Sequence, residues 1–191
     1  WPRGEFMLIA LPNPDSTFTV TLFLPNTGTP GFASLTDEAA LLDFFGQTFP
    51  DTLDLIPGLT QEFFANPTGE LGTVRCSPWH YRDQALLIGD AAHAVVPFHG
   101  QGMNCAFEDC AVLDDLVASH GKNWEEIFSR LTASRKPNAD AIADMALENY
   151  VEMRDTVRDP GFQLRTELAF ELERRLPDRF IPRYSMVMFH A

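Results

Sequence analysis

The sequence is short of positive charge. Its 191 residues include 14 Lys and Arg against 27 Asp and Glu, which gives a formal net charge of −13. Nucleic-acid binding depends on clustered Lys and Arg that neutralise phosphates, so this balance argues against a nucleic-acid partner. Long apolar runs are also missing. None reaches the length of a membrane-spanning helix, and we expect no membrane segment in this chain.

Cysteine is scarce as well. Cys76, Cys105 and Cys110 are odd in number and form no C-x-x-C motif. This set predicts reduced thiols in a cytoplasmic protein rather than a disulfide framework. His93 and His99 raise the question of a metal site, but no third ligand stands at a convincing spacing from them in the sequence. We therefore predict no metal.

Hydrophobic residues, by contrast, make up 45% of the sequence, which is ample for a packed core and argues against disorder. The chain is long enough for about one to one and a half domains. It opens on Trp1-Pro2-Arg3-Gly4 rather than on Met, and passes almost at once into the strand-like run FMLIAL. We therefore expect the C-terminal portion of a longer protein, with the N-terminal part of the same protein missing.

Residues 5–24 have the pattern of a β-hairpin. Two strand-like runs, EFMLIAL and TFTVTLFL, flank an Asn-Pro-Asp-Ser turn. Threonines alternate with apolar residues in the second run, which is typical of a sheet with one buried face. Phe23 breaks this alternation. Either both faces of the sheet are covered at that end, or the threonine face looks into a pocket.

The rest of the chain alternates between strand and helix signals. Thr36 is expected to cap a helix with a buried stripe of Leu41, Leu42 and Phe45. The strand at 85–88 is apolar throughout and is predicted to be buried on both faces. The other expected elements are a short helix at 60–65, a strand at 74–81, and helices at 102–119, 123–135, 138–158 and 161–176. This order predicts a two-lobed α/β protein whose second lobe completes a sheet begun elsewhere.

The segment ALLIGDAAHAVVPFHGQGMNCAFEDC contains the strongest functional signal. A buried strand that ends at Gly89-Asp90 would bring a carboxylate to the sheet edge where α/β folds hold their ligands. A buried Asp needs a donor, such as a ligand hydroxyl or a backbone N–H. Gly100 and Gly102 leave the start of the next helix bare, so that its N–H groups and positive dipole end face outward. This arrangement suits an anion, or a group that becomes anionic during turnover.

Two common phosphate-binding motifs are excluded. Gly100-Gln101-Gly102 is not the dinucleotide fingerprint, because Cys105 occupies the position of the third small residue and eleven residues separate the helix from its strand. A Walker loop is excluded because the chain contains no Gly-Lys-Ser/Thr. A bare G-x-G is weak evidence by itself, so the signal depends on the whole string.

That string, L-I-G-D-A-A-H followed by Pro97 and G-Q-G-M-N, resembles the second flavin-contact motif of the FAD-dependent aromatic hydroxylases, the group A flavoprotein monooxygenases. The resemblance implies that Asp90 accepts a hydrogen bond from the ribityl chain of FAD. It also implies that the N–H groups around Gly102 face the pyrimidine edge of the flavin, and that Pro97 and Phe98 lie beside the ring. The residues it assigns to the cofactor are Asp90, Pro97, Gly100, Gly102, Met103 and Asn104.

Within that family, the segments WPRGEFMLIALPN, TFTVTLFLP and ENYVEMR look most like the members that hydroxylate L-kynurenine. Asn149 then matches a residue that holds the amino-acid carboxylate of the substrate. From the sequence pattern alone, a satisfied polar group on an apolar helix face is the alternative for Asn149. The substrate-binding residues implied by the resemblance are Ile9, Leu11, Phe23, Phe98, His99, Asn149, Glu152, Met153 and Tyr184.

The resemblance also implies a fold. We expect an α/β (α+β) chain that forms part of the aromatic-hydroxylase fold and lacks its N-terminal Rossmann-type segment. Residues 1–72 would be part of the substrate-binding β-sheet lobe, 73–122 the C-terminal part of the FAD-binding domain, and 123–191 a helical region that closes the substrate pocket. The family's glycine-rich turn for the ADP half of FAD has no counterpart in this sequence.

The implied reaction is the hydroxylation of L-kynurenine to 3-hydroxykynurenine in tryptophan catabolism, with NADPH as cosubstrate and O₂. No nucleophilic Ser or Cys is expected, since the cofactor carries the chemistry and the protein supplies orientation and a dry pocket. Two alternatives stay open: another group A hydroxylase that acts on a different aromatic acid, and a non-catalytic binding lobe derived from a flavoprotein. We expect the chain by itself to turn over poorly or not at all.

Overall fold

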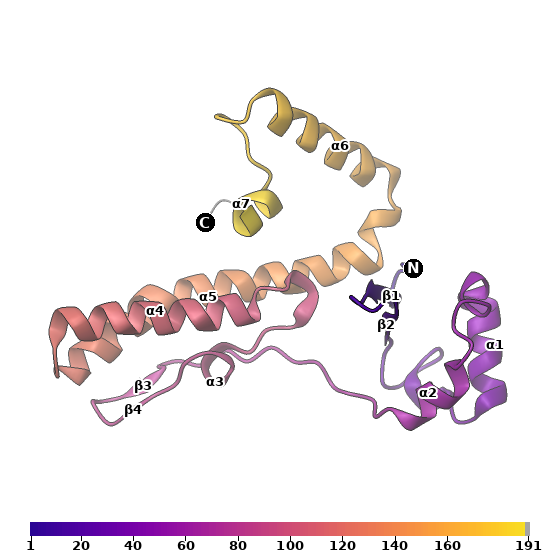
Figure 1. The fold of residues 1–191 in the computed structure, drawn as a ribbon, viewed down its shortest axis with the longest axis horizontal. Helices are drawn as coiled ribbons and strands as arrows, with labels where there is room; N and C mark the ends of the chain where they lie inside the picture. Colours follow the sequence, from indigo (N-terminus) through magenta and orange to yellow (C-terminus); the bar gives the residue numbers. More distant parts are fainter. Residues whose placement is uncertain (190–191) are drawn as a thin grey trace. The chain divides into compact units, whose positions relative to one another are not determined.

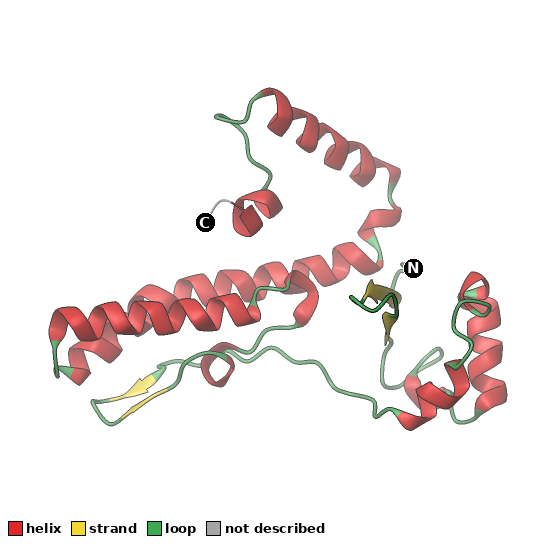
Figure 2. Ribbon diagram, viewed as in Figure 1, coloured by secondary structure: helices red, strands yellow, loops and turns green. Residues whose placement is uncertain are grey.

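The computed structural model describes residues 1–189. The chain forms two compact units, which are described separately (Figure 1). Unit 1 combines Trp1–Asn66 with the chain from Glu152 onward, and unit 2 comprises Pro67–Val151. Strands are few and short in both units, and helices dominate (Figure 2). No helix in the described part of the chain is both long enough and apolar enough to cross a membrane.

The predicted hairpin at the start of unit 1 is confirmed. Strand β1 (Met7–Pro12) pairs antiparallel with β2 (Phe18–Phe23), so that Met7 lies opposite Phe23. The turn between them is held by Asp15, whose carboxylate accepts hydrogen bonds from the backbone N–H of Thr17 at 3.1 Å and from its hydroxyl at 2.6 Å. This is the local side-chain bonding expected of an Asn-Pro-Asp-Ser turn.

Burial along the hairpin does not alternate as predicted. Met7 and Leu8, at the base, are buried, whereas Leu11 and Phe18, near the tip, are 57% and 60% exposed. Within unit 1 only the base of the hairpin packs against the hydrophobic core. The expectation of one fully buried face was therefore wrong. Burial here depends on how far a residue lies from the base of the hairpin, and not on which face of the strand its side chain occupies.

The core of unit 1 is formed mainly by helix α1 (Glu38–Thr48), with α2 (Leu59–Ala65) packed nearby. The helix is capped by Asp37 and not by Thr36, since the Asp37 carboxylate accepts from the Ala40 N–H at 2.9 Å. Spacing of four residues puts the fully buried positions on one stripe, and the expected stripe member Leu42 is 40% exposed. The buried core residues are Leu8, Leu24, Leu35, Leu41, Phe45 and Phe49.

The C-terminal part of unit 1 is helical. Helix α6 (Pro160–Arg175) is close to the predicted 161–176 and is capped by Asp159, whose carboxylate accepts from the Gly161 N–H at 3.0 Å. A second helix, α7 (Arg183–Phe189), follows Pro182. Helix α7 was not predicted, because seven residues give too short a window for helical periodicity.

In unit 2 the predicted strands are much reduced. Strand β3 (His80–Tyr81) pairs antiparallel with β4 (Ala85–Leu86), and the two form a sheet with no third strand in the described residues. Leu87, expected to be buried on both faces, is 42% exposed. That expectation was wrong for this chain, because a strand is covered on both faces only when other elements pack on each side of its sheet.

Two long helices form the body of unit 2. Helix α4 (Gly102–His120) agrees with the predicted 102–119, and α5 (Trp124–Arg154), which unit 2 contains up to Val151, runs antiparallel beside it (Figure 1). The predicted break near Pro137 does not occur, and α5, 31 residues long in all, continues through this proline. Proline removes one helical hydrogen bond, but α5 is buried on both sides of it, at Leu131, Arg135 and Ala139, and this packing holds it continuous.

Candidate functional site

The Gly89-Asp90 turn leads into a one-turn helix, α3 (Asp90–His93). Gly89 has φ +58°, and a Cβ built at this position would lie 3.2 Å from the Cβ of Ala106 on α4. Both the positive φ and the close approach therefore require glycine here. Asp90 is the first residue of α3 and is exposed, so its carboxylate lies at the surface of unit 2 and not inside a sheet edge as predicted.

The loop between α3 and α4 contains a short 3₁₀ turn at Pro97–His99. Gly100 ends this turn in the left-handed region, with φ +71°, and its N–H donates to the Pro97 carbonyl at 3.1 Å. A left-handed residue at this point turns the chain so that α4 begins at Gly102. Gly100 is exposed, as are Pro97 and Asn104.

The start of α4 is open. Among the described residues no side chain caps this helix end, and its first turn, Gly-Met-Asn-Cys, carries no acid. Met103 is 68% exposed, and the Asn104 amide donates to the Gln101 side chain at 2.9 Å. A 19-residue helix with an uncapped N-terminus offers backbone N–H groups and a positive dipole end to a ligand, which fits the anionic edge of a reduced flavin.

Behind this surface lies a buried network that the sequence analysis did not find. Asp109 on α4 is fully buried, and its Oδ2 accepts the Gly89 N–H at 3.1 Å and lies 2.5 Å from Nε2 of His93. Its Oδ1 accepts from Nε of Arg135 on α5 at 2.8 Å. Arg135 is itself 2% exposed and also pairs with Glu108 at 2.7 Å. Three elements, α3, α4 and α5, therefore meet on one carboxylate.

The network changes the protonation of its members. The pKa of His93 is raised to about 9, first by the side chain of Cys105 and then by Asp109, against the opposing effect of burial. Burial acts to raise the pKa of Asp109, but hydrogen bonds from Arg135, His93 and Gly89 outweigh it, and the pKa lies below its usual value. His93 is therefore an imidazolium at neutral pH, paired with a carboxylate.

The spacing argument against a third ligand near His93 was wrong. The side-chain ligand atoms of His93, Cys105 and Asp109 lie within 4.8 Å of one another. Cys105 and Asp109 stand four residues apart on one helix, which is the sequence signal that was missed. Both Asp109 oxygens, however, already accept hydrogen bonds, and the guanidinium of Arg135 lies against the same carboxylate. This arrangement favours an ion-pair network over a metal centre.

On the substrate side, unit 2 brings Asn149 and Phe98 together. The Asn149 side-chain amide donates to the Phe98 carbonyl. The centroids of the Phe98 and Tyr150 rings lie 4.6 Å apart. His99, in the same 3₁₀ turn, is buried. The contact anchors the Pro97–His99 turn on α5. It also gives Asn149 a partner of the kind that the alternative interpretation, a satisfied polar group, requires.

The other predicted substrate residues lie in unit 1. Ile9 is half-buried and pairs with Thr21 across the hairpin, Leu11 is exposed, and Phe23 is half-buried at the end of β2. The remaining members of the set are Glu152 and Met153, in the last turn of α5, and Tyr184, on α7. The pKa of Glu152 is raised by burial. The pocket expected to combine these residues with Phe98 and Asn149 remains a prediction.

Comparison with known families supports the flavin interpretation. A family described as "FAD binding domain" matches residues 56–146. This range contains α3, α4 and the loop between them, and so includes every residue that the sequence assigned to the cofactor.

Comparison with curated proteins is consistent with this result. The chain is 56% identical to kynurenine 3-monooxygenase of Myxococcus xanthus over 189 residues, which is 99% of this chain and 40% of that protein. It is 56% identical to the protein of the same name from Stenotrophomonas maltophilia, covering 41% of it, and 50% identical to that from Flavobacterium johnsoniae, covering 42%. The predicted resemblance is thus confirmed, and the chain spans about 40% of the length of these relatives.

Proposed function

We propose that this chain, a homologue of a segment of the kynurenine 3-monooxygenases, forms the flavin-ring side of the active site in an FAD-dependent monooxygenase. The enzyme would hydroxylate L-kynurenine at the ring carbon ortho to its amino group, with NADPH and O₂. Identities of 50–56% over 99% of the chain and the match to an FAD binding domain support the proposal.

One observation carries the proposal: the Asp90 turn is fixed directly against α4. Gly89 packs on Ala106 and donates to Asp109, both of which belong to α4. The exposed carboxylate of Asp90 and the uncapped N-terminus of α4 would therefore belong to one surface. A ligand that bound there would meet an acceptor for hydroxyl groups and a cluster of N–H donors for an anionic group.

FAD fits that pair of groups. Asp90 would accept a hydrogen bond from the ribityl chain, and the backbone N–H groups of Gly102, Met103 and Asn104 would face the pyrimidine edge. FAD, when bound, supplies the redox chemistry that activates O₂. The helix end stabilises negative charge by about 0.3–2 kcal/mol, so the protein would favour the reduced, anionic form of the cofactor.

The proposal also assigns roles to the substrate-binding residues that the resemblance implies. Asn149 and Tyr184 would hold the carboxylate of L-kynurenine, with Glu152 and Met153 close to the same end. Ile9, Leu11, Phe23 and Phe98 would form the apolar wall, and His99 would contact the carbonyl end of the ring. In this scheme residues 1–72 contribute to the substrate lobe, 73–122 to the FAD-binding domain and 123–191 to the helical cover.

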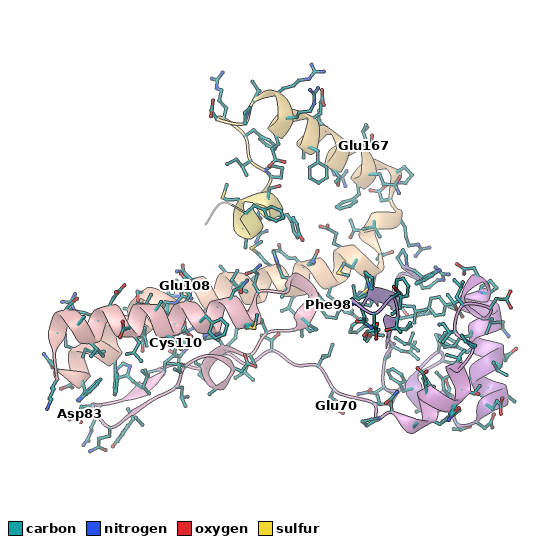
Figure 3. All side chains as sticks on the ribbon, in the orientation of Figure 1. Glu70, Asp83, Phe98, Glu108, Cys110 and Glu167 are labelled. Atoms are coloured by element: carbon teal, nitrogen blue, oxygen red, sulfur yellow. The ribbon has the colours of Figure 1, made fainter. Side chains whose placement is uncertain are left out.

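No protein nucleophile takes part in this scheme. The chain would orient the aromatic ring, exclude water and supply a fixed electrostatic environment. Its cytoplasmic location, inferred from the predicted reduced thiols, stays a prediction. Among the described residues all three cysteines are free thiols, and Cys110, which projects from α4 on a different side from Glu108 (Figure 3), is exposed.

The test is flavin binding. A full-length enzyme that contains this segment is prepared free of flavin and titrated with FAD, and binding is followed by the change in flavin fluorescence. We expect saturable binding that Asp90→Asn weakens by about tenfold, the loss of one charge-assisted hydrogen bond. Asp83→Asn, a matched loss of an exposed acid in the same unit, should leave the affinity unchanged. Binding that is absent in wild type, or equal in the two variants, would contradict the proposal.

Two further outcomes separate the alternatives. A full-length enzyme that contains this segment and hydroxylates another aromatic acid in preference to L-kynurenine would indicate a different group A hydroxylase. FAD-free protein with no flavin affinity in the full-length form would favour a non-catalytic lobe. The chain alone is expected to turn over poorly, because it contains no glycine-rich strand–helix turn for the ADP half of FAD.

A further inference from the structure

We propose that Asp109 is a positioning residue that clamps both ends of α3 and so fixes the Asp90 carboxylate relative to the start of α4. The inference rests on the proposed function only where it assigns Asp90 to a flavin. Gly89 immediately precedes α3 and His93 is its last residue, and the same oxygen, Oδ2 of Asp109, contacts both.

A one-turn helix needs such a clamp. Four residues close very few helical hydrogen bonds, here from the N–H groups of Ala92 and His93 to the Gly89 carbonyl at 2.9 and 3.0 Å. Nucleation of an isolated turn is unfavourable, so α3 does not hold its own geometry. Asp109 supplies the missing restraint from outside α3, because it belongs to the separate 19-residue helix α4.

Charge makes the clamp selective for a carboxylate. Asp109 faces two cationic groups, Arg135 from α5 and His93 from α3. Cys105 on α4 lies beside His93. The exposed Glu108 also pairs with Arg135. An amide at position 109 could accept from Gly89 or from Arg135, but it would leave the buried His93 imidazolium without a carboxylate partner and Arg135 with Glu108 alone. Removal of one partner from a buried ion pair is strongly destabilising.

Asp109 itself lies behind the surface that would meet the ligand. It is 0% exposed, whereas Asp90 is exposed. It would therefore act on ligand binding only through the position of the backbone turn. Glu108 offers a matched control, since it is the next residue on the same helix, has the same charge and binds the same Arg135, but it contacts neither end of α3 in the described structure.

The first measurement is amide hydrogen exchange at Gly89 and His93, compared between wild type, Asp109→Asn and Glu108→Gln. We expect exchange at Gly89 to be at least about tenfold faster in Asp109→Asn, because the single amide oxygen of Asn cannot accept from Gly89, His93 and Arg135 together. Glu108→Gln should leave it unchanged. Equal exchange rates at Gly89 in wild type and Asp109→Asn would overturn the proposal.

The second measurement uses Trp79, whose ring centroid lies 5.0 Å from that of His93. A protonated imidazole quenches indole fluorescence more strongly than a neutral one, so in a background with Trp1→Phe and Trp124→Phe the Trp79 signal reports the charge on His93. The midpoint should lie near pH 9 in wild type, since the pKa of His93 is raised to about 9, and should fall in Asp109→Asn. If that variant does not fold, the wild-type midpoint decides: a value at or below about 6.5 would overturn the proposal.

FAD titration then separates this inference from the proposed function. Asp109→Asn should weaken FAD binding by about tenfold or more while Glu108→Gln leaves it unchanged. Faster exchange at Gly89 with unaltered FAD affinity would overturn the assignment of the clamp to ligand positioning. Wild-type protein that binds no FAD but shows the expected exchange pattern would overturn the proposed function and leave the clamp supported.

Discussion

Arg135 on α5 donates to Asp109 on α4 across 2.8 Å, and neither side chain is more than 2% exposed. This ion pair ties the two long helices of unit 2 together. It also lies two residues before Pro137, within the part of α5 where a break was predicted. Two charged side chains that are almost fully buried thus lie beside the point where the local sequence favours disruption of the helix.

The first prediction concerns this ion pair. Arg135→Met should lower the free energy of unfolding by up to about 3–5 kcal/mol, because it removes one of the two cationic partners of the buried Asp109 carboxylate and leaves His93 as the other. Urea denaturation followed by far-UV circular dichroism measures the change. Arg130→Met is the control, since Arg130 forms an exposed pair with Glu126 on the same helix and should cost about 1 kcal/mol or less. Similar losses of unfolding free energy in both variants would mean that the buried pair stabilises the protein no more than the exposed pair does.

The second prediction is a pH dependence of stability. The pKa of His93 is raised to about 9 from its usual value near 6.5, so the contacts of His93 with Cys105 and Asp109 should contribute fully below about pH 6.5 and be lost as the pH rises through about 9. The contribution is up to about 3 kcal/mol. The lowered pKa of Asp109 has the opposite sign, so its contribution is lost in acid. Urea midpoints measured between pH 5 and pH 10 should fall in wild type and fall less in His93→Gln.

The third prediction concerns Gly89. Gly89→Ala should destabilise unit 2 by about 1–3 kcal/mol, because alanine at positive φ is strained and its Cβ would press on Ala106. Gly69→Ala is the control in the same unit, since a Cβ there meets nothing within 4 Å. Thermal unfolding of both variants checks this. A neutral Gly89→Ala would show that the turn adopts another conformation in solution.

The fourth prediction tests the open end of α4. In a full-length enzyme that contains this segment, Met103→Glu should lower the flavin midpoint potential by about 10–40 mV, because it brings negative charge to the first turn of the helix. Met103→Gln keeps the shape without the charge and should leave the potential near that of wild type. A spectroelectrochemical titration measures both. Equal potentials in the two variants would place the flavin edge away from this helix end.

The fifth prediction addresses the substrate carboxylate. In the same full-length enzyme, Asn149→Ala should raise KM for L-kynurenine by about tenfold with a smaller effect on kcat, because a binding contact far from the reacting carbon is lost. Leu147→Ala, at an exposed position on the same helix, should change neither. An unchanged KM in Asn149→Ala would indicate that its contact with the Phe98 carbonyl is purely structural.

Much of the local structure was predictable because it depends on short-range chemistry. The hairpin followed from a turn sequence flanked by strand-like runs, and α4 and α6 followed from their periodicity and starts. The exceptions have tertiary causes. Pro137 did not end α5, and the strand at 85–88 was not covered on both faces, because packing on each side and not local propensity decides these outcomes.

The sequence by itself determined the resemblance to flavin-dependent hydroxylases. Its glycines and aspartate are spaced as a tight turn and an uncapped helix start require, and local backbone sterics decide both features. Only the tertiary structure decided that His93, Asp109 and Arg135 meet in one buried network. His93 lies 16 positions before Asp109, and Arg135 lies 26 positions after it. No helical or strand periodicity links residues at these separations. The packing of α3, α4 and α5 brings these charges together and removes them from water, and a buried charge needs a partner.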